Sequence, residues 1–121
     1  MTDTATYLGA NGWLLNMAGL RVLLDPWLSG PLVFPPGAWL LKGEMPELMP
    51  IPDQIDLLLL TQGLPDHAHP ETLQALSKQI PVVASAAAAR VRYEMAQVRV
   101  AIPLMSSLLC IAIPLMSSLL C

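Results

Sequence analysis

The sequence predicts an α+β fold in which an amino-terminal β-hairpin and a strand–helix–strand–helix unit share one sheet. Two short apolar runs, at residues 20–24 and 57–60, lie between turn-forming residues, as is typical of buried strands. A turn of small residues at 17–19 precedes the first run and favours a hairpin there. After the second run, a proline opens a helical pattern, so the rest of the chain is predicted to alternate helix and strand.

The first strand region covers residues 4–15 and is interrupted by glycine and asparagine. The next strand, 20–24, is closed by Asp25 and the proline after it. We interpret Asp25 as a turn residue. We expect strands 20–24 and 57–60 to lie in one sheet, with Asp25 and Thr61 at their ends.

The connection at residues 28–52 is rich in proline and glycine, which predicts a loop and excludes a long helix. One helical turn is expected near residues 38–42. Trp27, Phe34 and Trp39 are expected to pack this loop against the sheet, because aromatic side chains in loops usually bury.

A polar loop follows strand 57–60 and carries Asp66, His67 and His69. Layered folds place chemistry on loops at the carboxyl ends of buried strands. These three side chains are therefore the candidate functional residues of the chain.

A strand–helix–strand unit extends beyond this loop. The pattern after Pro70 predicts a helix over 71–79, and residues 80–84 read as a short buried strand. Ser85 is placed to cap a helix over 86–97. Because such a unit joins parallel strands, this strand is expected to run parallel to the one before the polar loop.

Two segments resemble the metallo-β-lactamase-fold hydrolases. The stretch LLLLTQGLPDHAHPETL is similar to the first metal-binding segment of that superfamily, where an apolar strand runs into His-x-His-x-Asp-His. Asp66 and His67 match the terminal Asp-His, whereas Gln62 and Leu64 stand where the two leading histidines would be. The earlier stretch VLLDPWLSG resembles the Asp-Pro-Trp that follows a strand in many members, and the two segments occur in the family's order.

The resemblance implies an αββα layered sandwich, of which this chain would supply the amino-terminal half only. It also implies metal-dependent hydrolysis of ester, amide or phosphoester bonds with zinc as cofactor. The implied metal ligands are Asp66 and His67, with His69 as an unaligned further candidate, and Asp66 is the candidate catalytic residue. A catalytic zinc takes about three protein ligands and a structural zinc about four. We therefore expect a degenerate and truncated chain that is inactive by itself.

Structural interpretations of the same residues leave a non-catalytic function open. Asp66 could accept hydrogen bonds from loop and helix amides, His67 could be buried and hydrogen-bonded, and His69 could be an exposed residue before the helix. A non-catalytic member of the fold would bind a small molecule or a partner at the former cleft. The loss of both leading histidines favours this alternative over hydrolysis. A small membrane-anchored protein is a third hypothesis.

Composition excludes some classes of partner. The net charge is -3 and no basic block is present, so we expect no nucleic-acid partner. The first residues lack a basic region followed by an apolar core, so we expect no signal peptide and a cytoplasmic or organelle-stromal location. Since 55% of the residues are hydrophobic and 12% charged, half a layered domain would expose apolar surface. Self-association through an exposed sheet or the apolar tail is therefore expected.

The tail, residues 100–121, contains the segments VAIPLMSSLLC and IAIPLMSSLLC, which differ only in their first residue. Each copy ends in one of the two cysteines, a pattern that indicates neither a disulfide framework nor a zinc ribbon. The uncharged length would suffice to span a bilayer, but Pro103 and Pro114 interrupt a helix, so we expect no membrane partner. Two copies are too few for a repeat fold. We therefore predict a partial metallo-β-lactamase-like domain at 1–99 and a tail that is foreign to the fold, as after a frameshift or gene-end error.

Overall fold

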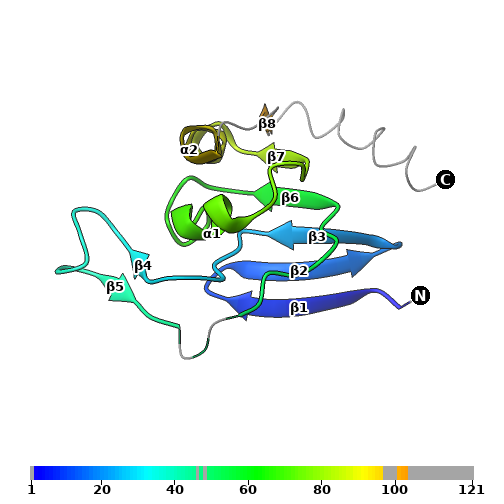
Figure 1. Ribbon diagram of the computed structural model, residues 1–121, viewed down its shortest axis with the longest axis horizontal. Helices are drawn as coiled ribbons and strands as arrows, with labels where there is room; N and C mark the ends of the chain where they lie inside the picture. Colours follow the sequence, from blue (N-terminus) through cyan, green and yellow to red (C-terminus); the bar gives the residue numbers. More distant parts are fainter. Residues whose placement is uncertain (1, 46, 48, 97–100, 104–121) are drawn as a thin grey trace.

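The computed structural model describes residues 2–45, 47, 49–96 and 101–103. Over these residues the chain forms a six-stranded mixed sheet, a small two-stranded sheet and two helices (Figure 1). The strands are β1 (Thr4–Gly9), β2 (Gly12–Met17), β3 (Leu20–Leu24), β4 (Leu32–Val33), β5 (Lys42–Gly43), β6 (Leu57–Leu60), β7 (Val82–Ala84) and β8 (Ala101–Pro103). The helices are α1 (Pro70–Ala75) and α2 (Ala86–Ala96). Neither described helix is long and apolar enough to cross a membrane.

The amino-terminal part is an antiparallel meander of β1, β2 and β3. The region expected as one interrupted strand is in fact two strands, because the chain reverses tightly after Gly9, which has a φ of 99°. The turn predicted between the next two strands is confirmed. Ala18 and Gly19 have φ values of 50° and 82°, and a two-residue hairpin turn of this kind needs positive φ at both positions.

The rest of the main sheet is parallel, in the order β3, β6, β7 and β8. The prediction that the 20–24 and 57–60 strands share a sheet is confirmed, since Leu23 lies opposite Leu58. The predicted parallel pairing across the helix-containing unit is confirmed as well, since Leu58 lies opposite Val82. A mixed sheet with few helices is compatible with the amino-terminal part of the fold that the resemblance implies.

Both helices begin where the sequence predicts. Pro70 occupies the first turn of α1, and the Ser85 hydroxyl accepts a hydrogen bond from the Ala88 amide at 3.3 Å at the start of α2. Helix α1 ends at Ala75, earlier than expected, because Leu76 turns to an extended conformation with a ψ of 144°. The sheet includes the first residues of the duplicated tail as β8, whereas residues 104–121 lie outside the described part. The domain boundary and the origin of the tail remain predictions.

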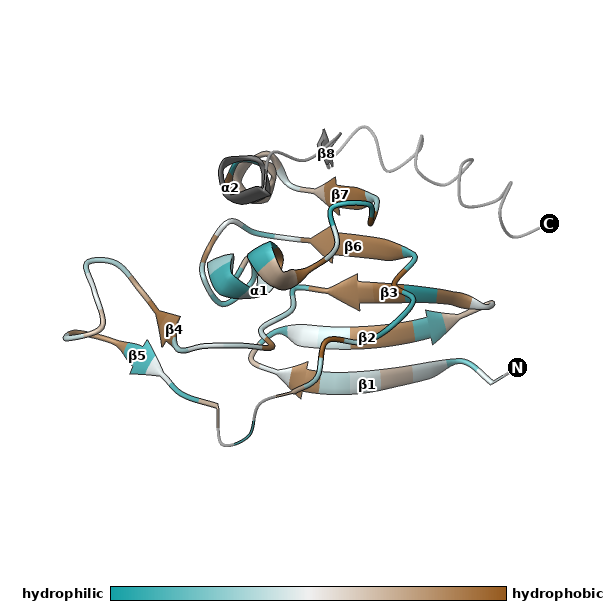
Figure 2. Ribbon diagram, in the orientation of Figure 1, coloured by the Kyte–Doolittle hydropathy of each residue, from teal (hydrophilic) through white to brown (hydrophobic). Residues whose placement is uncertain are grey.

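The two faces of the main sheet differ in their covering. Residues paired across strands project to the same face. One ladder is 0–8% exposed and belongs to the same buried cluster as Leu73 of α1 and Ala88 of α2: Leu14, Leu23, Leu58 and Val82. Figure 2 shows that β6 and β7 are apolar along their length. The other ladder is half-buried or exposed: Trp13, Leu24, Leu59 and Val83. Tyr7 and Met17 add to it, with exposures of 55% and 42%. The hydrophobic core therefore lies on the helix side of the sheet.

The connection before β6 forms an arm that extends away from the main sheet (Figure 1). Its two short strands, β4 and β5, flank a turn in which the Leu40 amide donates to the Gly37 carbonyl oxygen at 3.1 Å. Trp27 is buried at the base of the arm, as expected. Trp39 is 79% exposed, so the expectation that it packs against the sheet is wrong. It lies in the turn between β4 and β5, where its side chain faces solvent.

Candidate functional site

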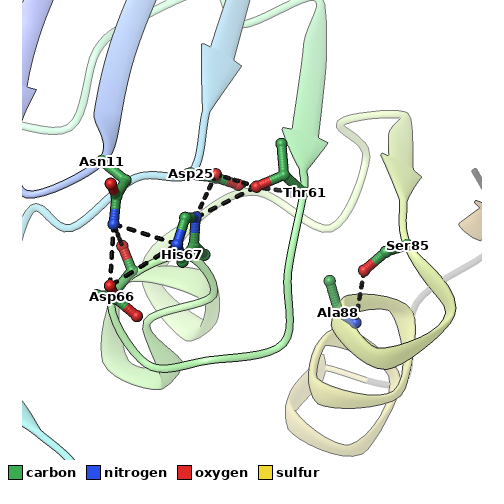
Figure 3. A network of polar contacts seen from close by, with 7 residues as sticks. All are labelled: Asn11, Asp25, Thr61, Asp66, His67, Ser85 and Ala88. Atoms are coloured by element: carbon green, nitrogen blue, oxygen red, sulfur yellow. Dashed lines mark hydrogen bonds and ion pairs between the residues drawn. The ribbon is translucent and has the colours of Figure 1, made fainter.

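Five polar side chains meet where β3 and β6 end (Figure 3). Because these strands are parallel neighbours, their carboxyl ends reach the same edge of the sheet, and Asp25 and Thr61 follow them directly. The loop after β6 brings Asp66 and His67 to this edge, and the turn between β1 and β2 brings Asn11.

Asp25 is the centre of this network. Its side chain is 4% exposed, and Oδ1 accepts the Thr61 backbone N–H at 2.8 Å. Oδ2 accepts the Thr61 hydroxyl and lies 2.7 Å from Nδ1 of His67. The interpretation of Asp25 as a turn residue was therefore incomplete. It has the positive φ of a turn, at 40°, and it also bonds two elements that are distant in the sequence.

His67 is oriented by this carboxylate. A carboxylate oxygen can only accept, so the nitrogen beside it, Nδ1, carries a proton. The other ring nitrogen, Nε2, faces Asp66 and lies 3.7 Å from its Oδ2. A carboxylate that holds one imidazole nitrogen and turns the other toward a second ligand is the arrangement that fixes histidines in metal sites.

Asp66 is only partly satisfied by the protein. Its Oδ2 accepts a hydrogen bond from the Asn11 amide at 3.0 Å. Its Oδ1 is buried and has no hydrogen-bond partner within the described residues. Such an oxygen would normally be satisfied by a donor or a cation.

The chain matches the family described as beta-lactamase superfamily domain over residues 4–103. It belongs to this family. The superfamily resemblance carried by the Asp66–His67 stretch and the Asp25–Pro26–Trp27 stretch is thereby confirmed.

A curated relative of this beta-lactamase superfamily chain is cytidine monophosphate-N-acetylneuraminic acid hydroxylase of Danio rerio. The two are 36% identical over 78 residues, which is 64% of this chain and 13% of the relative. The chain thus spans about 13% of the length of the relative that it matches. No solved structure matches the chain.

His69 lies apart from the other two predicted ligands. It is 2% exposed and caps α1, where its Nδ1 lies 3.0 Å from the Thr72 hydroxyl and 3.3 Å from the Thr72 amide. Its Nε2 lies 2.9 Å from the carbonyl oxygen of Pro31 and must donate to it. The interpretation of His69 as an exposed residue is wrong. Its role as a metal ligand remains a prediction, and it would require one of these bonds to break.

The positions of the two missing histidines do not complete a metal site. Gln62 and Leu64 are exposed, Leu64 by 53%. In the described part of the chain, no group of three or more His, Cys, Asp or Glu side chains is placed to hold a metal. Asp66 and His67 offer two side chains that can bind a metal, and one oxygen of Asp66 has no hydrogen-bond partner among the described residues. Two such side chains are about half of the ligands that a zinc site needs. A catalytic zinc takes about three protein ligands, so these residues alone do not fit zinc.

Sequence reasoning missed Asn11, Asp25 and Thr61 as parts of the network. Asp25 and Thr61 were placed correctly at strand ends. Parallel pairing of those strands is the signal from which contact between the two side chains could have been predicted. From the sequence, Asn11 is expected only to interrupt the strand predicted at residues 4–15. Its contact with Asp66 spans 55 positions of the sequence, and no local pattern indicates it.

Proposed function

We propose that this chain carries the metal-binding edge of a metal-dependent, hydrolase-like domain in a degenerate form without hydrolytic turnover of its own. The observation that supports this is the arrangement of Asp25, His67 and Asp66. A histidine oriented by a buried carboxylate faces a second carboxylate at the carboxyl edge of a parallel strand pair. That arrangement suits a ligand pair, and exposed Gln62 and Leu64 stand where further ligands would be needed.

Zinc at a complete edge of this kind would polarise a substrate oxygen and supply a hydroxide near neutral pH. The residues described here reach only half of such a site, so we assign no hydrolytic step to Asp66. The relative's name describes a hydroxylase, but a chain that spans 13% of it gives no basis for extending that reaction.

The layered sandwich is part of the same proposal. The face that carries Trp13 and Leu59 is apolar and has no helix over it among the described residues. In an αββα sandwich, a second sheet would pack on such a face. A bound partner or a second copy of the chain would cover the same surface, which supports the alternative of a non-catalytic, partner-binding member.

The experiment that tests the proposed function compares three proteins with zinc added: the natural chain, Gln62→His/Leu64→His and the control Gln62→Ala/Leu64→Ala. We expect the histidine variant to bind zinc about 10- to 100-fold more tightly than the other two, because it restores two ligands beside Asp66. We expect none of the three to hydrolyse p-nitrophenyl esters or bis-p-nitrophenyl phosphate faster than zinc in buffer. Zinc-dependent turnover by the natural chain that disappears in Asp66→Ala would contradict the proposal.

A further inference from the structure

The side-chain amide of Asn11 lies between Asp66 and His67 (Figure 3). Its Nδ2 is 3.0 Å from Oδ2 of Asp66, 3.3 Å from the backbone oxygen of Asp66 and 3.3 Å from Nε2 of His67. Three potential acceptors thus surround one nitrogen that carries two protons.

The tautomer of His67 that Asp25 selects leaves Nε2 free to accept a hydrogen bond from Asn11. Nδ1 donates to Asp25, so in the neutral ring Nε2 has a lone pair and no proton. Nε2 and the Asp66 carboxylate are then two acceptors 3.7 Å apart, which would repel each other if nothing lay between them. A donor placed between them removes that repulsion.

The orientation of the Asn11 amide follows from the same contacts. If the amide were rotated, its oxygen would lie about 3 Å from the Asp66 carboxylate and close to the Asp66 carbonyl oxygen. Two acceptors facing each other at that distance are unfavourable. The NH₂ group therefore points to Asp66 and His67.

We infer that the Asn11 amide replaces a metal ion at this edge, so that Asp66 and His67 are held together by a donor from the protein itself. This inference deepens the proposed function and rests on its assignment of Asp66 and His67 to a former metal-binding edge. It also gives a reason why Asp66 and His67 lie side by side although two protein ligands fall short of a zinc site. The turn at Gly9 and Ala10, with φ values of 99° and 47°, presents Asn11 to the edge.

A single substitution should convert the arrangement into a cation site. Asn11→Asp replaces the amide donor with a carboxylate, which would be a third metal ligand beside Asp66 and His67. Oδ1 of Asp66 already lacks a hydrogen-bond partner among the described residues. Two carboxylates and one imidazole are a ligand set that suits zinc or cobalt(II).

The first measurement uses the natural 121-residue chain labelled with ¹⁵N. Long-range ¹H–¹⁵N correlation spectra of the imidazole rings distinguish the two tautomers of His67. We expect the neutral ring to carry its proton on Nδ1 and not on Nε2, with no change when EDTA is added. A neutral ring with its proton on Nε2 would direct an N–H donor at the NH₂ group of Asn11 and would overturn the inference.

The second measurement is a cobalt(II) titration of the natural chain, Asn11→Asp and Asn11→Ala, followed by visible absorption. We expect Asn11→Asp to bind cobalt at least about 10-fold more tightly than the natural chain. We expect a smaller increase in cobalt affinity for Asn11→Ala, because it removes the amide donor without adding a metal ligand. Equal binding by the natural chain and Asn11→Asp would overturn the inference. Hydrolysis by the natural chain would instead overturn the proposed function and leave the tautomer result to decide the role of Asn11.

Discussion

At the scale of single residues, Asp25 explains how the edge of the sheet is organised. One buried carboxylate accepts a backbone amide, a hydroxyl and an imidazole N–H, which leaves both of its oxygens satisfied. The residues that it joins, Thr61 and His67, are 36 and 42 positions away. Asp25 therefore stabilises the fold and sets the direction of His67 at the same time.

We predict that Asp25→Asn lowers the free energy of unfolding by about 2–3 kcal/mol. An amide has one oxygen that can accept, and its NH₂ group would face groups that donate to the carboxylate of Asp25. Urea unfolding measures this change. The matched control is Asp56→Asn, since exposed Asp56 accepts one backbone N–H, from Arg21 at 2.7 Å, at the other end of β6. The control should cost about 1 kcal/mol or less. Equal losses in the two variants would refute a special role for Asp25.

At the scale of elements, helix α1 is tied to the loop after β3 by a short chain of hydrogen bonds. The Leu28 amide donates to the Thr72 hydroxyl at 2.9 Å, and this hydroxyl lies 3.0 Å from Nδ1 of His69. Nε2 of His69 reaches Pro31 in the same loop. The loop that begins with Asp25 is thus held against the helix that follows His67. These hydrogen bonds therefore help to position Asp25 and His67 relative to each other.

We predict that Thr72→Val, which keeps the shape of the side chain and removes its hydroxyl, destabilises the chain by about 1–3 kcal/mol. It leaves the buried Leu28 amide without its acceptor. Thr72→Ser retains the hydroxyl and serves as the control. Hydrogen exchange should show faster exchange of the Leu28 amide in the valine variant than in the serine variant. Unchanged protection at Leu28 would contradict this account of the loop.

The elements themselves could largely be predicted from the sequence, and the arm and the network could not. Runs such as Leu57–Leu60 between turn-forming residues identify buried strands by local pattern alone. Trp39 illustrates the opposite case, since an aromatic residue in a loop is equally compatible with packing and with exposure until the loop's course is known. Asn11 and Asp25 take their roles from side-chain contacts with residues far along the chain, and no local pattern in the sequence indicates these contacts.

At the scale of the whole molecule, one side of the main sheet is covered by helices and the other is apolar and open in the described part of the chain. Trp13 is 37% exposed, Met17 is 42% exposed, and Tyr7 lies with its ring 5.1 Å from that of Trp13. Strand β1 also lies at the edge of the sheet. Both features favour association with another surface.

We predict that the purified chain self-associates through this open face and that Trp13→Lys/Met17→Lys shifts it toward the monomer. Placing charges on a buried apolar contact would be unfavourable, so the association should weaken at least about tenfold. Sedimentation velocity measures the shift. The control is Trp39→Lys, which changes an exposed tryptophan on the arm and leaves the sheet face intact. If Trp39→Lys alone dissolves the association, the arm and not the sheet face forms the contact.

We propose that Asp25 and Asn11 hold Asp66 and His67 in place without a metal ion. The decisive measurement is elemental analysis of the chain purified without chelator. We expect much less than one zinc per chain, and thermal unfolding that EDTA leaves unchanged. One tightly bound zinc per chain, lost in Asp66→Ala or His67→Ala, would contradict it.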